Sequence, residues 1–202
     1  ITKKFGVVWI VDEVKTGLTV AAGGATELFG ISPDMVCLAK ALGAGLPTGA
    51  IGATDELWGP VLSGDVFMVG TFNGNPLVMA AARANLERVM TPDAYLRLGS
   101  INARLLNGAQ GIIDQYRLAA YPVGIESKGV ITFATSKVVD YESYKSAQQR
   151  DLIDLVWLWN MNRGIFSTPG RDEEWTLSIA MTDADVDHYL GAFEELAAEL
   201  TR

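Results

Sequence analysis

Two residues could together support carbonyl chemistry in this chain. Lys40 lies in an apolar, alanine-rich run, and a lysine amine in such a setting can form an imine with an aldehyde cofactor. Asp12 follows the hydrophobic run of residues 7–11, where a carboxylate could hold a cationic ring nitrogen. An imine-forming lysine and an acid that pairs with a ring cation are what a pyridoxal phosphate site requires. The two residues therefore predict such a site.

Each residue also has a simpler interpretation. A lysine between alanines is commonly a solvated helix position, and an aspartate after a strand is often a turn residue or a helix cap. Neither residue carries the assignment alone. It depends on a resemblance to a known family that rests on the whole segment, including the order of Asp12 and Lys40 and the glycines between them.

The first part of the chain has the pattern of an α/β domain. Residues 7–11 form a continuous apolar run with β-branched side chains, which predicts a strand buried on both faces in a parallel sheet. Residues 35–38 and 49–53 are two further strand candidates. A compact loop, residues 70–76, then leads into an alanine-rich helix expected over residues 76–89, with Pro76 in its first turn.

The rest of the chain predicts a small α+β domain. A hinge at residues 91–93 precedes a helix over residues 92–116, a strand near 129–134 and a long helix near 141–162 that ends at Arg163-Gly164. A strand over 175–180 and a final helix to about Leu200 follow, and Thr182 with Asp185 resembles a capping box at the start of that helix. We therefore expect two domains, residues 1–91 and 92–202.

Composition excludes several classes of function. A net charge of −8 argues against nucleic-acid binding, and the single Cys37 of the 202 residues rules out an internal disulfide. His188 is the only histidine, which argues against a metal site and a Ser-His-Asp triad, and the glycines form no Walker-type phosphate loop. No run of residues is apolar enough to span a membrane, so the sequence predicts a cytosolic protein. Because the chain begins at Ile1, close to a strand, we expect it to be the later part of a longer polypeptide.

The chain resembles the class III (subgroup II) aminotransferases, a fold-type I family that uses pyridoxal 5′-phosphate. The resemblance extends over the whole chain and corresponds to the second half of a typical member. Within the family, the chain is most similar to glutamate-1-semialdehyde aminomutases and to transaminases that act on β-amino acids. The segments that carry the resemblance are residues 10–17, 20–25, 29–34, 38–47, 70–76, 163–169 and 182–187. It implies a mixed or parallel sheet in the remainder of a large domain, followed by a small C-terminal α+β domain.

The resemblance also implies roles for single residues. Lys40 would form the imine with the cofactor and then move a proton, and Asp12 would pair with the protonated ring nitrogen. Val14 would pack on one face of the ring, while Glu13 would serve local hydrogen bonding only.

A shared active site is also implied. Thr71, in a loop with Gly70, would reach the cofactor phosphate of a neighbouring subunit, so a homodimer is expected. Arg171 and Glu173 would approach the substrate, and the Arg171 guanidinium would hold a carboxylate of the substrate. The same run is also typical of a solvated turn. The family's phosphate cradle and ring-stacking aromatic come from its first half and have no counterpart here.

Three functions stay open. The chain is expected to belong to an enzyme that transfers an amino group between an amine or amino acid and a carbonyl acceptor. A glutamate-1-semialdehyde-type aminomutase would instead relocate the nitrogen within one molecule and need no separate acceptor. An inactive fragment that keeps the fold without doing chemistry is the third.

Overall fold

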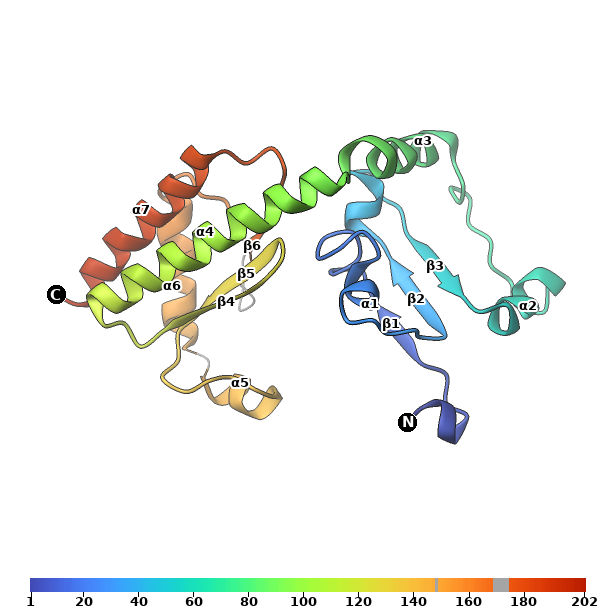
Figure 1. Ribbon diagram of the computed structural model, residues 1–202, viewed down its shortest axis with the longest axis horizontal. Coiled ribbons are helices and arrows are strands. Elements are labelled where there is room, and N and C mark those ends of the chain that lie inside the picture. Colours follow the sequence, from blue (N-terminus) through green and yellow to red (C-terminus); the bar gives the residue numbers. More distant parts are fainter. Residues whose placement is uncertain (148, 169–174) are drawn as a thin grey trace. The chain divides into compact units, whose positions relative to one another are not determined.

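The chain forms two compact units, which we describe separately. The structure is a computed structural model that describes residues 1–147, 149–168 and 175–202. One unit comprises Ile1–Tyr95 and the other Leu96–Arg202 (Figure 1). In the described part of the chain, no helix combines the length and apolar character that a membrane span needs.

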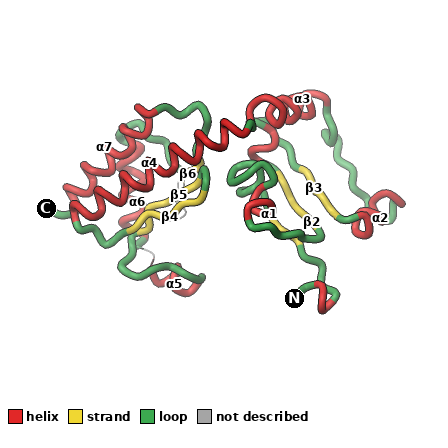
Figure 2. The backbone as a smooth tube through the Cα atoms, viewed as in Figure 1, coloured by secondary structure: helices red, strands yellow, loops and turns green. Residues whose placement is uncertain are grey.

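The first unit contains a three-stranded mixed sheet in the order β1-β2-β3 (Figure 1). Strand β1 (Ile10–Asp12) runs parallel to the central strand β2 (Met35–Leu38), and β3 (Ala50–Ala53) runs antiparallel to β2. The helices of this unit are η1 (Lys3–Phe5), α1 (Gly24–Leu28), η2 (Lys40–Gly43), α2 (Asp55–Ser63), α3 (Pro76–Ala84) and the π-helix η3 (Asn85–Val89). Residues 64–75 between α2 and α3 form neither helix nor strand (Figure 2).

The prediction of a strand over residues 7–11 that is buried on both faces was wrong. Only three residues pair in β1, and the first ladder pair joins Ile10 to Met35. Val7 and Val8 precede the ladder and are 55% and 48% exposed, and Ile10 is 54% exposed. The described residues do not cover these side chains, so an apolar run that would suit a strand covered on both faces is left open in this chain.

The expected helix over residues 76–89 begins as predicted and changes type before it ends. Asn75 caps α3, because its side chain accepts a hydrogen bond from the backbone N–H of Val78 at 3.0 Å, and Pro76 opens the first turn. The N–H of Met90 bonds to the carbonyl of Asn85 at 2.9 Å, five residues back, so the last turn is a π-helix.

The second unit packs helices around an antiparallel sheet in the order β4-β5-β6. Helix α4 (Pro92–Tyr116) leads into β4 (Tyr121–Ile125), β5 (Lys128–Thr132), α5 (Tyr141–Ala147), α6 (Arg150–Met161), β6 (Trp175–Thr176) and α7 (Asp183–Leu200). Its larger buried cluster comprises Ala109, Ile112, Ile113, Phe133, Val156, Phe193, Leu196 and Ala197.

Three predictions in this unit need correction. The helix expected over 141–162 is two helices. Gln149, which precedes α6, has a non-helical backbone, and its side chain donates to the carbonyl of Phe133 at 3.2 Å. Strand β4 was missed, because its Pro122 and Gly124 disfavour strands, yet Pro122 is tolerated on this edge strand. The last strand contains two residues rather than six.

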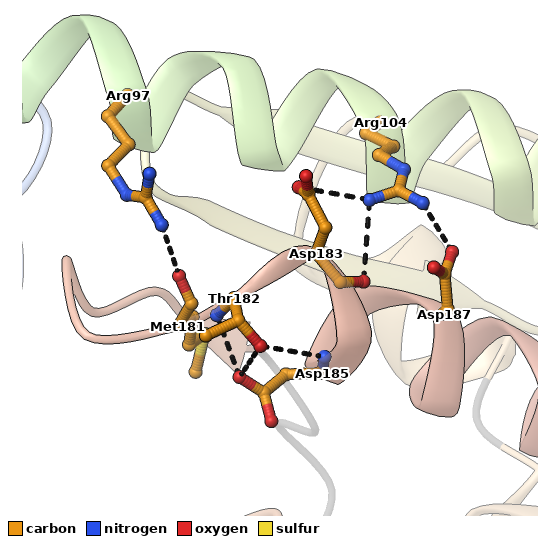
Figure 3. Close-up of polar contacts among 7 residues, drawn as sticks. All are labelled: Arg97, Arg104, Met181, Thr182, Asp183, Asp185 and Asp187. Atoms are coloured by element: carbon orange, nitrogen blue, oxygen red, sulfur yellow. Dashed lines mark hydrogen bonds and ion pairs between the residues drawn. The ribbon is translucent and has the colours of Figure 1, made fainter.

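The predicted capping box at the start of α7 is present (Figure 3). The Thr182 hydroxyl accepts from the N–H of Asp185 at 3.3 Å, and the Asp185 carboxylate accepts from the N–H of Thr182 at 2.7 Å. The first turns of α7 are also held to α4, because Arg104 of α4 forms ion pairs with Asp183 and Asp187 of α7. The sequence alone therefore located this helix start correctly.

Candidate active site

The two predicted catalytic positions lie at the same end of the sheet, because each is at or just after the carboxyl end of one of two neighbouring parallel strands. Asp12 is the last residue of β1, and its partner in β2 is Cys37. Lys40 follows the end of β2 by two residues. Ligands of open α/β sheets bind beyond the carboxyl ends of the strands. The topology therefore places Asp12 and Lys40 where a ligand is expected.

Lys40 has a strained backbone and a free side chain. Its φ is +44°, in the left-handed region that non-glycine residues avoid, and it opens the short helix η2. The side chain is exposed and makes no hydrogen bond or ion pair with any residue that the structure describes. Strain of this kind costs of order 1–3 kcal/mol and is concentrated at functional sites.

Asp12 offers one free carboxylate oxygen. Its Oδ1 accepts a hydrogen bond from the backbone N–H of Val14 at 2.9 Å, which fixes the side chain at the strand end. Within the described chain, Oδ2 has no hydrogen-bond partner. The arrangement suits an acid that is held by one oxygen and presents the other to a cation. Val14 itself is half-buried in the loop that follows.

Glu13 has a different role from its neighbour Asp12. It is 1% exposed, and its carboxylate accepts from the N–H of Ala25 at 2.9 Å, the N–H of Thr26 at 2.6 Å and the hydroxyl of Thr16. Burial raises the pKa of Glu13, but these hydrogen bonds together lower it by more than burial raises it. The pKa of Glu13 therefore lies below its ordinary value. Glu13 thus ties the start of α1 to the end of β1, in agreement with its predicted structural role.

Two glycines let this loop close around Glu13. Gly24 has φ +71°, and a Cβ there would lie 2.5 Å from the Glu13 carboxylate. A Cβ on Gly17 would lie 2.4 Å from the Leu38 side chain and 2.7 Å from the Glu13 carbonyl. The loop between Asp12 and α1 therefore packs directly against the strand that leads to Lys40.

Replacing Glu13 by glutamine is expected to destabilise the protein by about 2 kcal/mol at pH 7, because an amide NH₂ cannot accept the hydrogen bonds that the second carboxylate oxygen accepts. Since the folded-state pKa is depressed, this stability is present above the unfolded-state pKa and is lost as pH falls through the folded-state value. The difference between parent and variant should therefore shrink below about pH 4.

Urea unfolding at pH 7 and at acidic pH measures both effects. Glu27→Gln is the matched control, because Glu27 also accepts a backbone N–H, that of Gly23 at 2.6 Å, but is exposed. Equal losses in the two variants at pH 7 would contradict the role assigned to Glu13.

The remaining predicted site residues are not joined to this pair. Gly70 and Thr71 are exposed in a turn, in which the N–H of Asn73 bonds to the Gly70 carbonyl at 3.0 Å, and no hydrogen bond connects Thr71 to Asp12 or Lys40. Arg171 and Glu173 lie outside the described residues. No group of three or more His, Cys, Asp or Glu side chains suited to a metal occurs among the residues that the structure describes.

Asn85 forms a bond next to Lys40 that the sequence did not reveal. It is 6% exposed, and its side-chain Nδ2 donates to the carbonyl of Ala41, next to Lys40, at 2.7 Å. The available signal was a single amide in an otherwise alanine-rich helix, and nothing in the sequence connects it to a segment 44 positions earlier.

Comparison with solved structures identifies the fold as that of fold-type I transaminases. A β-phenylalanine aminotransferase from Variovorax paradoxus superposes with a TM-score of 0.85 at 28% identity, over 98% of this chain and 46% of that chain. A glutamate-1-semialdehyde aminomutase from Pseudomonas aeruginosa in complex with PMP has a TM-score of 0.87 at 23% identity, over the same shares. The predicted fold class is confirmed.

The family follows from the sequence comparisons. Residues 1–143 match the family model of class-III aminotransferases, so the chain belongs to that family. A glutamate-1-semialdehyde 2,1-aminomutase from Brevibacillus brevis is 35% identical over 95% of this chain and 45% of its own length. The chain thus spans about half the length of the curated relatives it matches.

Proposed function

We propose that the full-length protein containing this chain transfers an amino group between an amine or amino acid and a carbonyl acceptor, with pyridoxal 5′-phosphate as cofactor. The observation that carries the proposal is a pair of groups, Asp12 Oδ2 and Lys40, that have no partner among the described residues and lie at the carboxyl ends of adjacent parallel strands. Both lie within the segment that matches the aminotransferase family model.

The residues present fit this cofactor. When bound, pyridoxal phosphate supplies an aldehyde and an electron-withdrawing ring. The Nζ amine of Lys40 would bind the aldehyde carbon and later, as a free amine, hold and move the proton of the substrate carbon that bears nitrogen. The Asp12 carboxylate would hold the proton on the ring nitrogen, while its Oδ1 stays fixed by the N–H of Val14.

Several assignments belong to the same proposal. Val14 would pack on the ring, and Gly70 with Thr71 would bind the cofactor phosphate of a partner subunit in a homodimer. Arg171 and Glu173 would face the substrate. Residues 1–91 would then be the later part of the large cofactor-binding domain and residues 92–202 the small domain, in a cytosolic enzyme.

The exposed apolar side chains of Val7 and Val8, which precede β1, and of Ile10 within it support further polypeptide over the sheet of the first unit. This chain covers 45% of the length of the Brevibacillus brevis relative, which leaves room for such polypeptide.

An aminomutase is the second candidate. The observation in its favour is the name of the curated relatives, of which those from Brevibacillus brevis and Chloroflexus aggregans are 35% and 34% identical to this chain. An aminomutase isomerises an amino aldehyde without a separate acceptor, whereas a transaminase needs a second carbonyl compound.

Borohydride reduction of the full-length protein with pyridoxal phosphate, followed by peptide mass mapping, tests the cofactor assignment. A pyridoxyl adduct on Lys40 is expected, and an adduct elsewhere or none would overturn the proposal. Assays with an amine donor, with and without a keto acid, then separate the two reactions. Turnover that depends on the keto acid supports the transaminase, and isomerisation without it supports the aminomutase.

A further inference from the structure

A buried amide holds the segment that carries Lys40. Asn85 begins the π-helix η3, is 6% exposed and donates from Nδ2 to the Ala41 carbonyl at 2.7 Å. A buried side-chain amide needs such a partner, since an unsatisfied one costs about 1–3 kcal/mol. The bond joins elements 44 positions apart and ends one residue from Lys40.

The accepting carbonyl is itself part of the turn that Lys40 opens. Ala41 also accepts the N–H of Ala44 at 3.2 Å, so its carbonyl is fixed from within η2 and from η3. Gly43 in the same turn is buried, and a Cβ there would lie 2.8 Å from the Thr48 side chain. The peptide between Ala41 and Leu42, which begins one residue after Lys40, therefore has little freedom to rotate.

This restraint acts where the backbone is strained. Lys40 has φ +44°, and such a conformation persists only where surrounding contacts determine it. The donor lies where α3 changes into the π-helical turn η3, a distortion that is frequent at functional sites.

We propose that Asn85 is a positioning residue that fixes the Lys40 amine through the Ala41 carbonyl. The inference rests on the proposed function, in which Lys40 is the reactive amine. It extends the active site to a residue that touches neither cofactor nor substrate and acts through the orientation of η2.

The test compares Asn85→Asp with the matched variant Asn102→Asp in the full-length protein. Both asparagines are buried and donate from Nδ2 to a backbone carbonyl, that of Ala41 for Asn85 and that of Lys128, at 3.0 Å, for Asn102. Asn102 lies in the other unit, on α4. Each aspartate keeps the side-chain shape, loses the donor and puts an oxygen against the carbonyl.

For Asn85→Asp we expect kcat to fall about 10- to 100-fold with little change in the KM for the amine donor. The pH at which the absorption of the lysine-bound cofactor changes should also shift. In the cofactor-free protein, the amide of Ala44 should exchange with solvent at least about 10-fold faster. Asn102→Asp should lose comparable stability to urea and show none of these three effects.

Equal behaviour of the two variants, with stability lost but kcat, pH transition and Ala44 exchange unchanged, would make Asn85 a structural residue only. If Asn85→Asp does not fold, Asn85→Ala removes the donor without the repulsion and is judged by the same measurements. Amide exchange in the cofactor-free protein keeps this test separate from the proposed function. A parent protein without a cofactor adduct on Lys40 would refute that function, whereas unchanged Ala44 exchange would refute the restraint.

Discussion

Replacing Lys40 by alanine in the full-length protein is expected to abolish the absorption of the lysine-bound cofactor and to lower kcat by at least about 10²- to 10⁴-fold. The alanine has no amine to bind the aldehyde or to move the proton. Global stability should change little or rise, because the Lys40 side chain is exposed and bonded to no described residue. Spectroscopy, steady-state kinetics and urea unfolding measure the three quantities.

Lys3→Ala is the control, because Lys3 is an exposed lysine in η1 of the same unit. It should keep the parent absorption and kcat. A Lys40→Ala variant that still showed the band of an imine-bound cofactor would mean that another lysine is the reactive one, and the assignment to Lys40 would be withdrawn.

Local signals made the helix starts predictable. Asn75-Pro76 and Thr182 with Asp185 satisfy the free N–H groups of a first turn from residues at most three positions away, so short sequence patterns are sufficient to locate them. Strand β4 depends on pairing with β5 instead, and its Pro122 and Gly124 point locally to a turn. The prediction that residues 7–11 are buried was wrong, because burial depends on what covers the sheet, and a run of apolar residues does not specify that.

The same distinction applies to the candidate site. Asp12 and Lys40 could be located from sequence, since both follow short apolar runs and parallel pairing brings strand ends together. Asn85 could not, because its bond to Ala41 joins two helical turns whose approach is a property of the folded unit. The roles of Thr71, Arg171 and Glu173 stay predictions: Thr71 is exposed without a described partner in the site, and the other two lie outside the described residues.

Replacing Asp12 by asparagine is expected to lower kcat about 10- to 150-fold, since a hydrogen bond between charged groups contributes about 1.5–3 kcal/mol. Asparagine can still accept the N–H of Val14 through its side-chain oxygen, so the loop should keep its place. What is lost is the negative charge at Oδ2 that would keep a proton on the ring nitrogen. The cofactor should also bind more weakly, measured by titration of the cofactor-free protein.

The matched control is Asp34→Asn, because Asp34 also accepts a backbone N–H, that of Trp9 at 2.8 Å. Asp34 differs from Asp12 in that it precedes β2 and so lies at the opposite end of the strands. Its substitution should leave kcat and cofactor affinity near parent values. If Asp12→Asn behaved like Asp34→Asn, Asp12 would be only a strand-end cap for Val14. If only Asp12→Asn lost activity, the charge rather than the loop geometry would be responsible, because both variants retain a backbone acceptor.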